Sequence, residues 1–197
     1  MRKPILFVLA LAMAVTLAGF IPMDPTVPAV SGNTTVKWIS FEEAVELSKK
    51  EKRKIFIDVY TDWCGWCKVM DNKTFTDPGI ATLLNEKFYA VKFNAEQRAD
   101  VVFNGHTFKF VQSGRGGYHE LAAALLNNKL SYPNFVFMND EFQIVPHLVP
   151  GYDTSVPGYR KPEDFHIFLS YVGDDHFQKM RFEDYQKVYQ SPYAPAK

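Results

Sequence analysis

Residues 55–68 read IFIDVYTDWCGWCK, and this stretch decides the fold. Its first six residues are β-branched or aromatic except for Asp58, so they are apolar on both faces, as a central parallel strand would be. Both cysteines of the chain, Cys64 and Cys67, follow directly in one Cys-x-x-Cys spacing. We predict that a helix begins at Cys64, which places the pair at a strand-to-helix junction.

This placement gives the two cysteines a chemical meaning. The free backbone N–H groups and the positive end of the helix dipole stabilise a thiolate at Cys64, which makes it the attacking sulfur. Cys67 lies one turn further on, where it can close a disulfide with Cys64. A bridge that closes four residues stabilises the fold by only about 2 kcal/mol in the chain-entropy treatment, so the bond suits exchange better than stapling.

Two other interpretations of the pair stay open at this point. A structural disulfide is common in exported proteins, although it usually ties distant segments. A zinc half-site needs four ligands, and the sequence has no second Cys-x-x-Cys. The five histidines are scattered without ligand spacing: His106, His119, His147, His166 and His176. We therefore expect redox chemistry with no metal and no cofactor.

The segments on either side predict alternating helices and strands. Ser40-Phe41-Glu42-Glu43 has the form of a capping box before an amphipathic helix. Asp77-Pro78 has the form of a cap with proline at the first helical position, and a strand is expected over 89–94. Strands that alternate with helices indicate an α/β class with a mixed sheet.

Further along the chain we expect two hairpins and more helices. The first hairpin joins 101–103 to 107–111 around Asn104-Gly105, and the glycines of 114–117 should break the chain before a helix over 118–126. The other expected segments are a second hairpin of 134–138 with 142–145, a helix over 162–172, and a last segment with Phe182, Tyr185 and Tyr189 on one side.

From about Val36 to Val172 the chain resembles the thioredoxin family, chiefly through the motif from Asp58 to Lys68. The resemblance implies a thioredoxin fold, with a mixed central sheet flanked by helices. It also implies that Asp58 is a buried acid near Cys67. An acid inside an apolar strand has a raised pKa and can exchange a proton with Cys67, whereas the plainer alternative is a strand-end aspartate held by backbone hydrogen bonds.

The resemblance also assigns residues around the cysteines. Lys92 would approach the buried acid and support proton transfer, although an ordinary solvated lysine is the alternative. Tyr132-Pro133 resembles the family's cis-proline, with a trans edge-strand proline as the alternative. The residues expected to contact substrate are Trp63, Gly65, Trp66, Tyr132 and Pro133. Trp66 replaces the proline usual between the cysteines, which leaves the direction of electron flow open.

The rest of the chain divides around this domain. Residues 1–20 begin with Arg2 and Lys3 and continue as an uncharged apolar run, which predicts a secretory signal peptide or, alternatively, an N-terminal membrane anchor. We expect a linker over 21–35, a thioredoxin-like domain over 36–173 with a hairpin insertion at about 97–117, and a C-terminal helical extension over 174–197. The chain is then exported to the periplasm or another extracytoplasmic space.

Composition agrees with a folded domain. The 197 residues include 17 Phe, 10 Tyr and 3 Trp, which is the reverse of a disordered composition. The 22 basic residues balance 22 acidic ones, which argues against nucleic acid as a partner. We therefore predict a thiol-disulfide oxidoreductase that acts on protein thiols and disulfides, with a membrane thiol carrier as electron donor. The alternative is a thioredoxin-fold binding module with a redox-inert disulfide.

Overall fold

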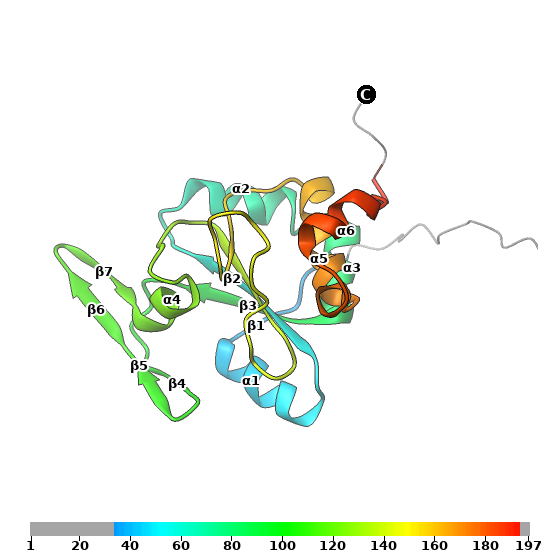
Figure 1. Ribbon diagram of the computed structural model, residues 1–197. Helices are drawn as coiled ribbons and strands as arrows, with labels where there is room; N and C mark the ends of the chain where they lie inside the picture. Colours follow the sequence, from blue (N-terminus) through cyan, green and yellow to red (C-terminus); the bar gives the residue numbers. More distant parts are fainter. Residues whose placement is uncertain (1–33, 194–197) are drawn as a thin grey trace, which may run out of the picture.

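A computed structural model of the protein describes residues 34–193 (Figure 1). The described residues do not include the predicted leader over 1–20 or residues 21–33 of the predicted linker. Within 34–193, no helix combines the length and the apolar character needed to cross a membrane.

The elements alternate as the sequence predicts. In chain order they are β1 (Trp38–Ile39), α1 (Phe41–Lys50), β2 (Lys54–Tyr60), α2 (Gly65–Lys73), α3 (Pro78–Lys87), β3 (Phe88–Asn94), β4 (Val101–Phe103), β5 (His106–Phe108), β6 (Phe110–Ser113), β7 (Gly116–His119), α4 (Glu120–Leu125), β8 (Asn134–Met138), β9 (Val156–Pro157), α5 (Pro162–Gly173), the 3-10 helix η1 (His176–Gln178) and α6 (Phe182–Val188). The central sheet has the order β1-β3-β2-β8-β9. β1, β3 and β2 are parallel, whereas β8 is antiparallel to β2 and β9 to β8, which confirms the mixed sheet and the α/β class.

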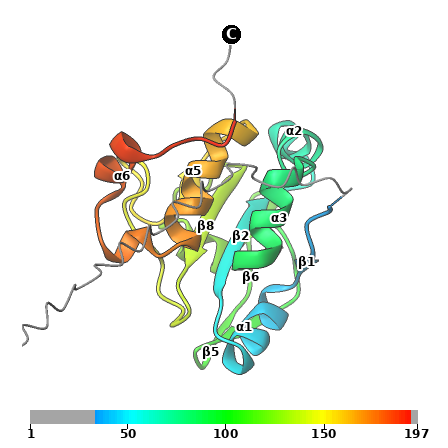
Figure 2. The same ribbon diagram turned by 90° about the vertical axis from the view of Figure 1, so that its right-hand side faces the viewer.

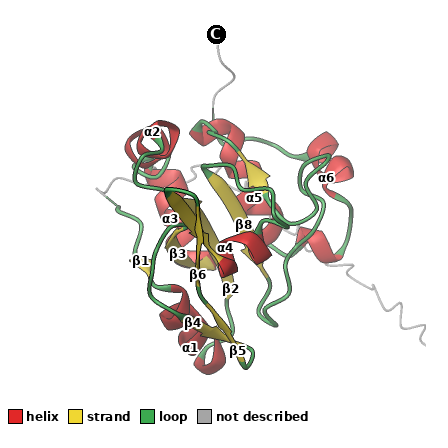
Figure 3. Ribbon diagram, turned by 90° about the vertical axis from the view of Figure 1, so that its left-hand side faces the viewer, coloured by secondary structure: helices red, strands yellow, loops and turns green. Residues whose placement is uncertain are grey.

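Helices cover both faces of this sheet (Figures 2 and 3). Along β2, Ile55, Ile57 and Val59 pack with α1 and α4 on one face. Phe56 packs on the other face with α3 and α5, and Asp58 follows it on that face because side chains alternate along a strand. The buried acid of the motif is therefore placed on the face that carries the larger, phenylalanine-rich core.

Several local predictions are confirmed. The Ser40 hydroxyl accepts a hydrogen bond from the Glu43 backbone N–H at 3.1 Å and caps α1. The Asp77 carboxylate accepts a hydrogen bond from the Ile80 backbone N–H at 3.0 Å and caps α3, whose first residue is Pro78. These signals are local in sequence, so they act wherever the segment lies in the fold.

Residues 101–119 form two hairpins where one was predicted, β4-β5 and β6-β7, and both project away from the sheet (Figure 1). The Asn104-Gly105 turn of the first hairpin is confirmed, with φ angles of 49° and 76°. The expected break at 114–117 is wrong in its second half, because Gly116 and Gly117 belong to β7. The expected helix also begins too early, since residue 118 pairs within β7 and α4 starts at Glu120.

The second predicted hairpin is confirmed only next to its turn. Met138, the last residue of β8, forms a bridge with Ile144, and two hydrogen bonds flank the bridge, from the Asn139 N–H to the Gln143 carbonyl and from the Val145 N–H to the Phe137 carbonyl. His147 is the next residue whose N–H would face β8, but its φ is 59° and its N–H donates to the Asp153 carbonyl, so the pairing ends there. The start of β8 pairs instead with β9.

The C-terminal segment packs on α5 (Figure 1). Phe182 and Tyr185 are buried against Phe168 and Tyr171, and Tyr189 is partly buried beside them. The prediction that Phe182, Tyr185 and Tyr189 share one side is confirmed.

Candidate active site

Cys64 and Cys67 form a disulfide at the start of α2, with their Cα atoms 5.3 Å apart. Cys64 is the N-cap residue of the helix, and its Sγ accepts a hydrogen bond from the Cys67 backbone N–H at 3.1 Å. The predicted strand-to-helix junction is thus confirmed. A negative charge on Cys64 would meet this N–H and the positive end of the helix dipole. Both residues are nearly buried, Cys64 at 4% exposure and Cys67 at 2%.

Asp58 lies in the middle of β2 and is 1% exposed. Its register partners are Lys92 on β3 and Phe135 on β8, so one neighbour is a cation and the other is apolar. One carboxylate oxygen, Oδ2, accepts a hydrogen bond from Lys92 Nζ at 2.6 Å, whereas Oδ1 has no partner among the described residues. Burial raises the pKa of Asp58 to about 6, although Lys92 lowers it.

Lys92 is held on several sides. Its ammonium bonds to Asp71 of α2 as well as to Asp58. It also lies 4.9 to 5.3 Å from the ring centres of three aromatic residues, Trp38, Tyr60 and Phe75. Burial lowers the pKa of Lys92, but the two carboxylates outweigh burial and its pKa lies above the ordinary value. An ammonium held in this way stays charged at neutral pH.

Asp71 was not among the predicted site residues. A signal was present, because Asp71 lies four residues after Cys67 and so shares a face of the helix with it. Only the structure shows that this face also meets Lys92. Asp71 is 40% exposed, so it forms the solvent-facing end of a row of three charged groups that ends at the buried Asp58.

The Tyr132-Pro133 peptide bond is cis, as the resemblance implies. Tyr132 contacts Trp63 edge to face, with ring centres 5.9 Å apart. The Trp63 indole N–H donates to a Glu96 carboxylate oxygen at 3.0 Å. Burial is the main cause that raises the pKa of Tyr132 to about 12, so its phenol stays neutral. Among the residues expected to contact substrate, Trp63 is therefore an indole whose orientation is fixed by a carboxylate.

Trp66 has a different partner, Tyr159, which was not among the predicted site residues either. The Tyr159 ring stacks on it with centres 5.6 Å apart and planes 25° apart. Tyr159 follows Gly158, whose N–H donates to the Pro133 carbonyl at 2.8 Å. Gly65 is exposed, and a Cβ added there would meet no atom within 4 Å. Its role in substrate contact stays a prediction.

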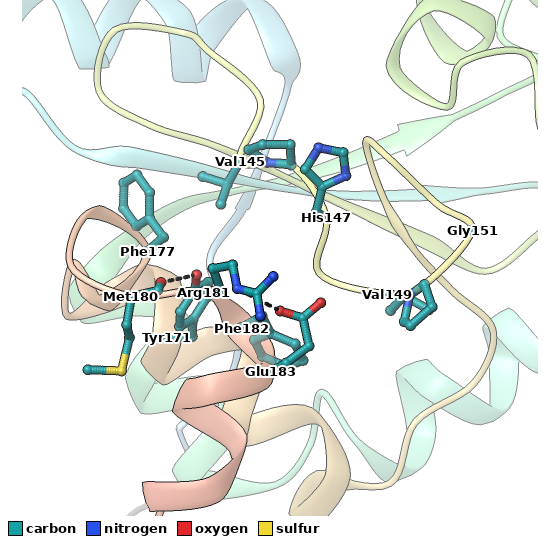
Figure 4. Close-up of a pocket in the computed structure, with 12 residues that line it drawn as sticks. Val145, His147, Val149, Gly151, Tyr171, Phe177, Met180, Arg181, Phe182 and Glu183 are labelled. Atoms are coloured by element: carbon teal, nitrogen blue, oxygen red, sulfur yellow. Dashed lines mark hydrogen bonds and ion pairs between the residues drawn. The ribbon is translucent and has the colours of Figure 1, made fainter.

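Other features of the described residues lie apart from the disulfide. A cavity of about 520 Å³ lies between the loop after β8 and the C-terminal helices (Figure 4). Val145, Val149, Phe177, Met180 and Phe182 line it, and none of its lining residues belongs to the segments around the cysteines. No group of three or more His, Cys, Asp or Glu side chains within 34–193 is arranged to hold a metal ion.

The mixed sheet, the disulfide at the start of α2 and the cis-proline define a thioredoxin-like protein of the disulfide oxidoreductase class. A family model described as "Thioredox_DsbH: Protein of unknown function, DUF255" matches residues 29–143. The chain belongs to this family.

The chain is similar to parts of much longer proteins. It is 37% identical over 84 residues to spermatogenesis-associated protein 20 of Rattus norvegicus, which is 42% of this chain and 11% of that protein. It is 36% identical over 45 residues to the thiol:disulfide interchange protein DsbD of Vibrio vulnificus, which is 23% of this chain and 8% of that protein. The chain thus spans about a tenth of the length of these curated relatives.

One solved structure supports the fold. A thioredoxin-fold protein from Helicobacter pylori superposes with a TM-score of 0.51 at 17% identity, covering 80% of this chain and 85% of that one. At this identity the likeness concerns the fold alone.

Proposed function

We propose that the protein is a thiol-disulfide oxidoreductase that exchanges disulfides with polypeptides through Cys64 and Cys67. The observation that carries the proposal is the position of the Cys64 Sγ, which caps α2 and accepts the Cys67 N–H. A thiolate is stabilised there by the same N–H and by the helix dipole, so Cys64 is the better nucleophile and the better leaving group of the pair.

In the reducing direction, the Cys64 thiolate attacks one sulfur of a substrate disulfide. A mixed disulfide forms and the first substrate thiolate leaves. The Cys67 thiolate then attacks Cys64 Sγ, which closes the Cys64–Cys67 bond and releases the second substrate thiolate. Two electrons pass to the substrate, and the two released thiolates take up protons. An external dithiol must reduce the pair again, and the reverse sequence oxidises a dithiol substrate.

Asp58 is the group that we assign to the proton of Cys67. A pKa of about 6 leaves most of the carboxyl ionised at neutral pH and able to accept that proton. Lys92 is a positioning residue, because its hydrogen bond to Oδ2 fixes one carboxylate oxygen and leaves Oδ1 without a partner among the described side chains.

We place this activity outside the cytoplasm, with a membrane thiol carrier as the source of electrons. The basic and apolar N-terminal sequence supports the location. The DsbD relative, a thiol:disulfide interchange protein, supports the kind of donor. A Cys67→Ser variant has no resolving thiol, so when it is mixed with the oxidised form of a purified donor domain, the Cys64 thiolate should break the donor disulfide and keep the donor bound as a mixed disulfide.

Insulin reduction with a dithiol reductant tests the central claim. The full chain should accelerate it, and Cys64→Ser should abolish the acceleration. Cys67→Ser is the matched control, because it should still form a mixed disulfide but not turn over. A titration of Cys64 in the reduced chain should give a pKa below about 8.5. An ordinary pKa with no reduction of insulin would leave the binding module with an inert disulfide as the function.

The reduction potential then gives the direction. A value near about −270 mV indicates a reductant, and one near about −120 mV indicates an oxidant.

A further inference from the structure

A small depression of about 290 Å³ lies on the Trp66 side of the disulfide. Its lining residues are Trp66, Tyr132, Pro133, Gly158 and Tyr159. They come from three segments: the start of α2, the loop before β8 and the turn after β9. None of the five side chains carries a charge at neutral pH, so the lining offers apolar and aromatic surface.

The turn after β9 gives the depression its shape. Gly158 has a φ of +83°, which favours glycine, and its N–H is bonded to the Pro133 carbonyl. This contact fixes the turn against the loop that carries the cis-proline. Tyr159 is thereby placed over Trp66, where the two rings stack.

Trp66 is nevertheless 61% exposed. The Tyr159 stack covers only part of the indole, and the remaining apolar surface is in contact with water. Contiguous exposed aromatic surface beside a reactive group is typical of a binding site. The surface around Trp63 differs, because its indole N–H is engaged by Glu96 and Asp62 lies next to it in the chain. Trp63 is not part of the depression.

We propose that this depression is a subsite for one large apolar side chain, preferably aromatic, next to the substrate cysteine, with Tyr159 as its specificity-determining residue. The proposal rests on the proposed function, because it assumes that a substrate sulfur bonds to Cys64. Trp66 lies between the two cysteines in the chain, so residues on either side of a bonded substrate cysteine pass close to it. An extended peptide advances about 3.3 Å per residue, so only the nearest neighbours of that cysteine reach the depression.

The lack of charge in the lining decides the class of side chain. A carboxylate or ammonium group that entered would lose water without gaining a counter-charge. An aromatic ring would instead gain stacking with Trp66 and Tyr159. The substrate should therefore carry a phenylalanine, tyrosine, tryptophan or similarly large apolar residue beside its reactive cysteine.

Single-turnover reduction of peptide disulfides tests the subsite. The reduced full chain is mixed with peptides that differ only at a residue adjacent to the cysteine, with Phe, Ala or Asp on either side. The Phe peptide in one of these positions should react about tenfold faster than the Ala peptide, as expected for one well-packed aromatic contact, and the Asp peptide should be slowest.

Variants at Tyr159 make the test specific. Tyr159→Ala should reduce the preference for Phe over Ala to less than about twofold, and Tyr159→Phe should retain the preference. Tyr159→Lys should favour the Asp peptide, a gain that misfolding cannot produce. Tyr118→Ala, on β7 and outside the depression, is the matched control and should keep the wild-type preference.

The outcomes separate this proposal from the proposed function. Equal rates for all three peptides in both positions, with reduction still fast, would overturn the subsite and leave the oxidoreductase intact. A preference for Phe that survives in Tyr159→Ala would overturn the role of Tyr159. Failure to reduce any of the peptides would overturn both proposals.

Discussion

Replacing Asp58 with asparagine should stabilise the protein at neutral pH, and the gain should depend on pH. The native state raises the pKa of this carboxyl from 3.8 to about 6. The native state therefore binds the proton more tightly than the unfolded chain does. This favours folding below pH 3.8, and the advantage is lost as the pH rises through 6. Asparagine has no proton to lose and should escape that loss.

The magnitude follows from the shift. Two pKa units at 1.36 kcal/mol each correspond to about 3 kcal/mol between the protonated and ionised limits. Most of this falls between pH 4 and pH 7. We therefore expect the free energy of unfolding of Asp58→Asn, minus that of the wild type, to be about 2 kcal/mol larger at pH 7 than at pH 4.

Urea denaturation of the oxidised proteins at intervals from pH 4 to pH 8 measures this difference. Subtracting the wild type cancels the other carboxyl groups wherever they are independent of Asp58. Asp100→Asn, at an exposed position, is the matched control for the removal of one carboxylate. A difference that is constant with pH, or one that changes only near pH 4, would show that the buried carboxyl does not titrate as inferred.

Two further predictions concern Asp71 and the β6-β7 hairpin. The charge of Asp71 raises the pKa of Asp58. Asp71→Asn should therefore move the midpoint of the pH-dependent change in the free energy of unfolding below pH 6. An unchanged midpoint in the same urea denaturation series would contradict this. Gly117→Ala would place a Cβ 2.3 Å from the Val111 carbonyl oxygen and should lower the free energy of unfolding, measured with urea, by about 1 to 3 kcal/mol. Gly116→Ala is the control, because a Cβ there meets no atom within 4 Å. Equal stability of the two variants would refute the steric argument.

The parts of the fold that were predictable are those fixed within one segment. The 55–60 strand is apolar over consecutive residues, and the caps at Ser40 and Asp77 bond to N–H groups three residues away. The position of the cysteine pair at a strand-to-helix junction was predictable for the same reason, because the strand before it and the helix after it are both encoded locally. Burial of Asp58 was predictable for this reason as well.

The missed features depend on contacts between distant segments. The strand β9 has only two residues, too few to show a period, yet it takes the edge of β8 that the 142–145 segment was expected to cover. Tyr159 follows that strand and meets Trp66 only because Gly158 bonds to Pro133. No pattern within 156–160 indicates an aromatic partner for residue 66.

The sharing of Lys92 between Asp58 and Asp71 accounts for part of the raised pKa of Asp58. One ammonium, Lys92, serves two carboxylates, so the three groups carry a net negative charge when all are ionised. The ionised form is disfavoured most at the carboxylate with the least contact with water. This is Asp58, which is 1% exposed, whereas Asp71 is 40% exposed. If Lys92 paired with Asp58 alone, it would favour the ionised form and lower the pKa of Asp58 further. Burial is the main cause that raises the pKa of Asp58 and the charge of Asp71 adds to it, so the carboxyl can take up and release a proton close to neutral pH, as our proposed role for Asp58 in the resolving step at Cys67 requires.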